Sequence, residues 1–251
     1  MIRPLDQNKL NLATSSKINI KIGDYINDGF SIYSRNWVEF SVYTFLSMIL
    51  IILSVITIVG PYLMMFPIQM GYSNAVEKIQ KGESIEMNDF FVGFKKWTSF
   101  IPYLLILILV GIGLMVGIFI YIGGFGFLAN ENEIFTAILG VSILSIIPIV
   151  IILSLLLSVA TFLIPYLIYH GNMSTMDCIK ASIKISTKNF LYLLLFIFLF
   201  SIISQIGVYL CVIGMFVTIP AAHIMSYLLV KDILLVDNQN EITDFGQSKD
   251  L

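Results

Sequence analysis

The chain has 251 residues, of which 58% are apolar and 12% are charged, against about 25% charged in ordinary soluble domains. Its formal net charge of −2 gives no indication of a nucleic-acid partner. Asp, Glu, Lys and Arg are absent from four long blocks, which are 40–76, 97–130, 134–176 and 189–230. A water-soluble domain cannot bury so much uncharged apolar chain, so the composition excludes a soluble enzyme, a disordered protein and a secreted disulfide scaffold.

The apolar blocks predict an all-α, polytopic transmembrane bundle, because a helix of about 20 apolar residues crosses a bilayer. Gly60-Pro61 divides the first block and Gly214 divides the last. The third block has room for one span and a short apolar segment, Phe135–Ile146, which is interfacial, re-entrant or part of a long kinked span. The six predicted spans are Phe40–Val59, Pro61–Ala75, Ile101–Ile122, Pro148–Tyr169, Phe190–Val212 and Met215–Val230.

The distribution of basic residues predicts the orientation of these spans. With both termini on the cytoplasmic side, all 14 Lys and Arg residues fall in cytoplasmic segments, as the positive-inside rule requires. We therefore expect a multi-pass protein of a bacterial-type cytoplasmic membrane. The expected organisation is a cytoplasmic N-terminal segment at 1–21, a single membrane domain at 22–235 and a flexible cytoplasmic tail at 236–251.

Each predicted hairpin of spans follows a stretch with helical apolar spacing, which predicts a cytoplasmic amphipathic helix. The three stretches run from Ile22 to Phe40, from Met87 to Ile101 and from Met176 to Phe190. Aromatic rings and long basic side chains prefer the membrane interface, so several residues at the ends of these helices are candidate anchors. The candidate interfacial anchors are Arg35, Trp37, Lys95, Lys96, Trp97 and Lys188.

Recurring motifs predict an internal pseudo-repeat. Residues 35–40 and 95–100 share the pattern basic–x–Trp–x–x–Phe, and Lys188-Asn189-Phe190 is a reduced version of it. Pro67 and Pro220 each precede a serine by six residues and a lysine by eleven. The expected architecture is therefore three units, each an amphipathic helix followed by a hairpin. Gly113 and Gly117 lie on one face of the third span and predict close helix packing there.

Residues with catalytic chemistry are sparse. The two histidines, His170 and His223, lack a neighbouring set of metal ligands, and no glycine-rich phosphate loop is present. The predicted spans contain no Asp, Glu, Lys or Arg, the residues that mark proton and ion pathways. We therefore expect no enzymatic activity and no cofactor.

Polar residues inside spans 2 and 6 form the one candidate intramembrane site, a patch of Gln69, Ser73, Asn74, Thr218, His223 and Ser226. These side chains have two interpretations. They make interhelical hydrogen bonds of about 0.6 kcal/mol each, or they line a site beside Pro67 and Pro220 that admits a headgroup or a small solute.

Several short motifs carry a resemblance to a known family. They are Asn36-Trp37, Gly71 with Lys81-Gly82-Glu83, Asp89-Phe90-Phe91-x-Gly93-Phe94, Ile179-Lys180-Ala181-Ser182, Lys188-Asn189-Phe190, Cys211-Val212-Ile213-Gly214 and Thr218-x-Pro220. In their order the chain resembles a broad family of bacterial six-span membrane proteins of unknown function, related to the membrane domain of some glycerophosphoryl diester phosphodiesterases. The stretch 124–147 departs from that pattern, and the phosphodiesterase catalytic barrel is missing. The resemblance implies membrane residence and a lipid or protein partner, and it implies no catalytic residue.

The sequence thus favours a non-enzymatic integral membrane protein that organises lipid or a partner protein in the cytoplasmic membrane. The alternative is an uncoupled transporter or exporter of a small or lipid-like solute that uses the polar faces of spans 2 and 6. The expected partners are membrane lipids together with a membrane protein or a second copy of the chain, and no nucleic acid.

Overall fold

The computed structural model describes residues 3–57, 59–129, 148–171, 173–209 and 211–236. Helices dominate this described part, which confirms the all-α prediction, and Leu5 and Leu235 form an isolated antiparallel bridge. The helices are α1 Gln7–Ser15, α2 Ile22–Arg35, α3 Trp37–Ser54, α4 Gly60–Gln80, α5 Met87–Phe90, the 3-10 helix η1 Phe91–Phe100, α6 Ile101–Ala129, a helix at 148–161, α8 Ile164–His170, α9 Thr175–Lys188, α10 Phe190–Tyr209 and α11 Cys211–Leu234. The predicted segment Phe135–Ile146 and most of the predicted tail, 237–251, lie outside the described residues.

Within the described residues, five helical segments are long and apolar enough to cross a membrane. They are Trp37–Ser54, Met87–Tyr121, Pro148–His170, Phe190–Tyr209 and Gly214–Leu234, and they coincide with predicted spans 1, 3, 4, 5 and 6. Predicted span 2 is also helical, as part of α4, but it is not among these five. The reason is its polarity, because Gln69, Ser73 and Asn74 lie in its second half and Glu77 and Lys78 follow. Most of the C-terminal half of α4 is buried inside the protein.

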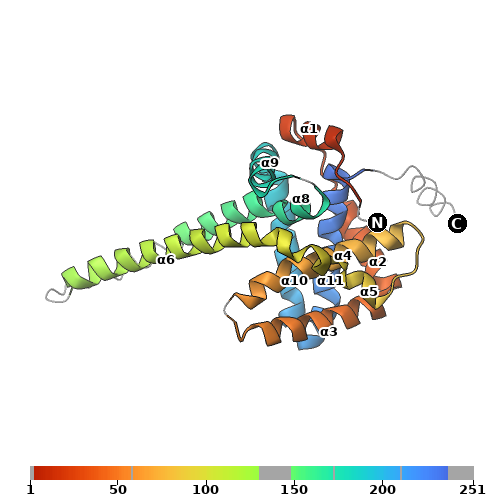
Figure 1. Cartoon of the computed structure of the whole chain (residues 1–251), viewed down its shortest axis with the longest axis horizontal. Coiled ribbons are helices and arrows are strands. Elements are labelled where there is room, and N and C mark those ends of the chain that lie inside the picture. The colour runs from red at the N-terminus through yellow and green to blue at the C-terminus, as the bar shows by residue number, and fades with distance from the viewer. Residues whose placement is uncertain (1–2, 58, 130–147, 172, 210, 237–251) are drawn as a thin grey trace.

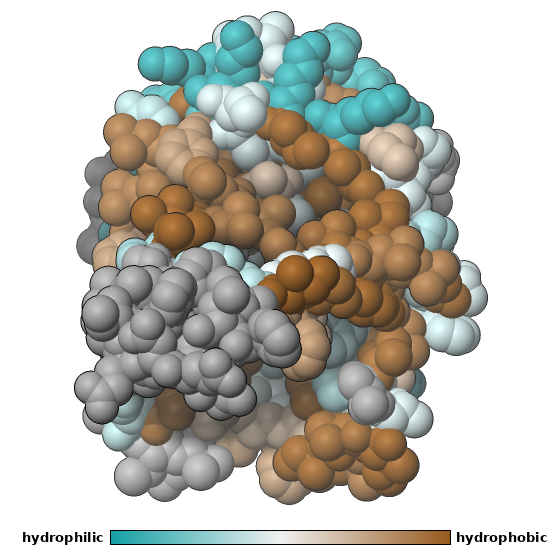
Figure 2. All heavy atoms as spheres, turned by 90° about the vertical axis from the view of Figure 1, so that its left-hand side faces the viewer, coloured by the Kyte–Doolittle hydropathy of each residue, from teal (hydrophilic) through white to brown (hydrophobic). Residues whose placement is uncertain are grey.

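The helices form a body and a projecting arm (Figure 1). The body is built around α11, which contacts α2, α3, α4 and α10. In Figure 1, α6 and the helix at 148–161 extend to the left as the arm, across the direction of α10 and α11. The arm exposes large apolar side chains such as Leu109, Met115 and Phe119, which are 69%, 74% and 78% exposed. Figure 2, viewed from the arm side, shows hydrophobic residues over most of that face and hydrophilic residues at its upper end.

Such a continuous apolar surface far exceeds what a water-soluble monomer exposes, and the bilayer is the solvent that covers it. The chain is a multi-pass integral membrane protein. The predicted close packing at Gly113 and Gly117 is not found within the described part of the chain, since a Cβ at either position meets no atom within 4 Å.

The predicted repeat appears as a recurring break in the backbone. One non-helical residue interrupts the helical backbone before each hairpin. Asn36 (φ −131°, ψ 34°) lies between α2 and α3, Lys96 (φ −112°, ψ 17°) lies within η1, and Asn189 (φ −116°, ψ 25°) lies between α9 and α10. A basic residue precedes each break and an aromatic ring follows it. The side-chain amides of Asn36 and Asn189 each donate from Nδ2 to the backbone carbonyl four residues earlier, at 3.1 and 3.0 Å. The pairs Asn36/Asn189 and Pro67/Pro220 are both 153 residues apart, so the first and third units correspond without a gap.

Two of the predicted amphipathic helices, α2 and α9, are present, and the face that each buries overlaps only in part with the one that apolar spacing predicted, with Tyr33 and Ser186 common to both. Helix α2 buries Tyr25, Gly29, Ile32 and Tyr33, and α9 buries Cys178, Ser182, Ile185 and Ser186. Several members of the predicted apolar faces are exposed instead, and these are Phe30, Trp37, Met176 and Ile183. Small and polar residues make the closest contacts, and they carry no apolar periodicity.

The third predicted amphipathic helix, at 87–101, is not a regular α-helix. It begins as the single turn α5 and continues as the ten-residue 3-10 helix η1. This segment approaches α4 closely at two glycines. A Cβ at Gly93 would overlap the carbonyl oxygen of Pro67, and a Cβ at Gly71 would overlap that of Phe90.

The N-terminal segment packs against the body. Helix α1 contacts α9 and α11 and buries Leu10 and Ala13. The backbone N–H of Asp6 donates to Leu234 O at 2.9 Å, and that of Val236 donates to Pro4 O at 3.3 Å. These bonds join the two ends of the described chain.

Two serines of α9 satisfy carbonyl groups where the 148–161 helix gives way to a turn before Pro165. Ser182 Oγ donates to Ala160 O at 2.6 Å and Ser186 Oγ donates to Val159 O at 2.7 Å. We expect the double change Ser182→Ala and Ser186→Ala to lower the free energy of unfolding by about 2 kcal/mol, because it removes two buried donors. Thr187→Ala is the control, since its exposed hydroxyl bonds only Lys184 O within its own turn. Denaturant unfolding in detergent measures both, and equal losses would contradict the assignment.

Candidate functional site

The structure brings three members of the predicted polar patch together around one tyrosine. Gln69 Nε2 donates to Tyr166 Oη at 3.1 Å, and the hydroxyls of Ser73 and Ser226 also face the Tyr166 side chain. Tyr166 is fully buried among them. Ser73 and Ser226 also donate to carbonyls one turn earlier in their own helices, at 3.2 and 3.0 Å. This part of the patch is therefore filled by a protein side chain.

The other three members point elsewhere. Asn74 Nδ2 donates to Asp89 O at 2.7 Å, which ties α4 to α5, and Thr218 Oγ1 donates to Gly214 O at 3.1 Å. The His223 ring stacks on Tyr72 with centroids 4.7 Å apart. The six residues thus do not form one continuous polar surface.

The proline in α11 frees a backbone carbonyl, as prolines inside helices do. Pro220 has no N–H for Phe216 O, and Ser41 Oγ of α3 lies 3.4 Å from that oxygen. A side chain from a neighbouring helix therefore takes the place that a bound solute would need.

The predicted anchors divide into exposed and internal groups. Trp37 and Trp97 are 59% and 45% exposed, and Arg35, Lys95 and Lys188 are exposed as well. Lys96 behaves differently, because its ammonium donates to Tyr169 O at 2.9 Å and lies 5.6 Å from the centroid of the Tyr169 ring. Lys96 thus caps the C-terminal end of α8 with its charge.

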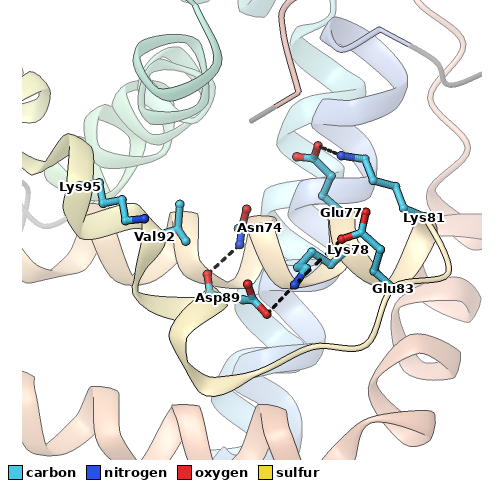
Figure 3. Close-up of a pocket in the computed structure, with 8 residues that line it drawn as sticks. All are labelled: Asn74, Glu77, Lys78, Lys81, Glu83, Asp89, Val92 and Lys95. Atoms are coloured by element: carbon cyan, nitrogen blue, oxygen red, sulfur yellow. Dashed lines mark hydrogen bonds and ion pairs between the residues drawn. The ribbon is translucent and has the colours of Figure 1, made fainter. Parts of the chain in front are cut away.

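A charged pocket, which sequence reasoning did not identify, lies between the end of α4 and the start of η1 (Figure 3). Its cavity measures about 570 Å³. The lining residues are Asn74, Glu77, Lys78, Lys81, Glu83, Asp89, Val92 and Lys95. The chain reverses direction beside it at Gly82, whose φ of 74° favours glycine. We call this cavity the charged pocket.

Ion pairs organise one side of the charged pocket. Lys78 Nζ lies 3.0 Å from Asp89 Oδ2 and 4.0 Å from Glu83 Oε2, and the hydrogen bond to Asp89 raises the pKa of Lys78. Lys81 Nζ lies 2.7 Å from Glu77 Oε1. Glu77 is buried and also accepts the backbone N–H of Arg3 at 3.3 Å, with the Arg3 guanidinium 4.0 Å away. The N-terminal segment therefore contacts the pocket lining, through the interactions of Arg3 with Glu77.

Two signals in the sequence point to part of this pocket. Glu77 and Lys81 have the i, i+4 spacing of a helical ion pair, and Glu86 and Asp89 have the spacing of a helix N-cap and its third residue. Asp89 Oδ2 indeed accepts the Glu86 N–H at 2.7 Å while it pairs with Lys78. The contact between α4 and η1, however, leaves no sequence signal other than glycine.

Within the described residues, no group of three His, Cys, Asp or Glu side chains is arranged to hold a metal ion. Cys178 is a free, buried thiol, and burial raises its pKa to about 11, so it is protonated at neutral pH. A protonated thiol is a poor nucleophile. Searches of family models, curated proteins and solved structures find no match to this chain.

Proposed function

We propose that this protein is a non-enzymatic integral membrane protein that organises lipid in a bacterial-type cytoplasmic membrane, with both termini on the cytoplasmic side. The observation that carries the proposal is the threefold recurrence of an exposed cation, a backbone break and an aromatic residue. Arg35, Lys95 and Lys188 supply the cations, and Trp37 and Trp97 are the exposed rings.

Physical chemistry supports this assignment. The breaks at Asn36 and Asn189 each separate a helix that packs on the body from a helix that is apolar enough to span the bilayer, and the break at Lys96 lies within the candidate span Met87–Tyr121. The junction is the level at which indole rings and long basic side chains are stable, and a cation beside anionic lipid contributes about 1 kcal/mol. All three units are suited to bind lipid. A protein partner or a second copy of the chain would bind in addition to the lipid.

Tryptophan fluorescence in lipid nanodiscs tests the proposal. Trp37→Phe and Trp97→Phe each leave a single tryptophan, since the chain has two. We expect blue-shifted emission from both variants and quenching by brominated lipid at interfacial depth. Neutralising Arg35, Lys95 and Lys188 together should weaken the quenching, whereas neutralising one should change it little. Emission typical of tryptophan in water, without quenching by any brominated lipid, would refute the proposal.

The transport alternative has less support in the geometry. It needs a polar path along α4 and α11, and there Gln69, Ser73 and Ser226 close on Tyr166. Flux of solute in reconstituted vesicles distinguishes the two functions, because lipid organisation predicts none.

A further inference from the structure

The charge balance of the charged pocket differs between its two ends. At the α4 end, Lys78 and Lys81 have carboxylate partners at 3.0 and 2.7 Å. At the η1 end, Lys95 makes no hydrogen bond or ion pair with any residue that the structure describes. In Figure 3 the Lys95 ammonium points toward the cavity, close to Val92. Three lysines and three carboxylates line the pocket, and Lys95 is the one of these lysines without a carboxylate partner among the described residues.

The pocket also has a buried polar part, which restricts what it can bind. Two of its polar lining residues, Asn74 and Glu77, are only 9% and 2% exposed. Asn74 uses its Nδ2 to bond Asp89 O, so its amide oxygen is left as an acceptor beside the cavity. A volume of about 570 Å³ falls within the range of about 300–1,000 Å³ found for small-molecule sites. The space suits a polar group that is larger than a single ion.

The position of the pocket indicates where such a group comes from. Lys95 comes one residue before the break at Lys96 and two before the exposed Trp97. On the proposed function, this junction lies at the level of the lipid phosphates. An ammonium at that level binds phosphate oxygens through charge-assisted hydrogen bonds.

We propose that the charged pocket binds a phosphate ester, with Lys95 as the ligand to the phosphate and the Asn74 amide oxygen as the acceptor for a donor group next to it. A phospholipid headgroup and a soluble phosphate ester have this chemistry in common. The lipid source rests on the proposed function, whereas the soluble source does not.

The test uses the full chain in nanodiscs with Trp37→Phe, so that Trp97 reports on the neighbouring pocket. One arm titrates O-phosphorylethanolamine into phosphatidylcholine discs, with inorganic phosphate as a second probe. The other arm varies the fraction of phosphatidylglycerol in the discs and counts retained lipids by native mass spectrometry. We compare Lys95→Gln and Lys95→Arg with Lys184→Gln, which removes an exposed cation of α9 that lies outside the pocket and is not one of the proposed lipid-binding cations.

We expect a saturable response that Lys95→Gln weakens about tenfold or more, and that Lys95→Arg and Lys184→Gln leave within about threefold. Saturation by O-phosphorylethanolamine identifies a soluble source, and loss of one retained phosphatidylglycerol identifies a lipid source. An equal effect of Lys95→Gln and Lys184→Gln, or no saturable response in either arm, would overturn the pocket while leaving tryptophan quenching and the proposed function intact. Lys95 is exposed, so unfolding of Lys95→Gln would itself contradict its role as a free ligand.

Discussion

Gly93→Ala is expected to lower the free energy of unfolding by about 2–3 kcal/mol, because the added methyl group has no space. It would meet the Pro67 carbonyl, which belongs to helical backbone and cannot rotate away as a side chain does. Helix α4 and η1 must therefore separate, and this also opens the wall of the charged pocket. Denaturant unfolding in detergent measures the loss.

Gly117→Ala is the matched control for this change. Gly117 lies in α6 with no atom within 4 Å of the new methyl group, and alanine is the better helix former by about 1 kcal/mol. We expect Gly117→Ala to be neutral or stabilising. Similar destabilisation by both variants would show that the contact between α4 and η1 does not determine the stability at Gly93.

Glu77→Gln is expected to cost about 3 kcal/mol of stability, since it removes one charge from a buried ion pair. The carboxylate lies 2.7 Å from Lys81 Nζ and receives the Arg3 N–H, and its side chain is 3% exposed. Loss of this charge should also loosen the N-terminal segment, which faster amide exchange at residues 3–6 would report.

Glu83→Gln provides the comparison on the same pocket. Its carboxylate lies 4.0 Å from Lys78 Nζ and is 53% exposed, so we expect a change below about 0.5 kcal/mol. If the two variants lose equal stability, the burial of Glu77 does not have the energetic role assigned to it.

The sequence predicted the parts of the fold that rest on local chemistry. Uncharged blocks predicted six spans, of which five coincide with helices long and apolar enough to cross a membrane. The recurring pattern of a basic residue and an aromatic ring marked the places where the structure has breaks at Asn36, Lys96 and Asn189, although the breaks themselves were not predicted. These features depend on hydropathy and on residues close together in the chain. Orientation, partners and function stay predictions.

The parts that the sequence did not predict depend on contacts between segments. The buried faces of α2 and α9 include Gly29 and Ser182, which allow close approach of the neighbouring helix but do not contribute to a pattern of apolar residues. The charged pocket forms because Gly71 and Gly93 bring α4 against η1, so that Lys95 comes to line the same cavity as Glu77. From the sequence alone, charged residues in a connection between two spans are expected to lie in water, and only the contact between α4 and η1 places them around a cavity.

The backbone breaks have a mechanical consequence. At Asn36, Lys96 and Asn189 the regular helix is interrupted by a single residue, so the helix before each break and the helix after it need not share an axis. The first and third hairpins are held by the contacts of α3, α4 and α10 with α11, so their joints fix the tilt of these spans against one another. The second hairpin projects from the body as the arm, and its joint at Lys96 sets the direction of α6 while η1 stays packed on α4.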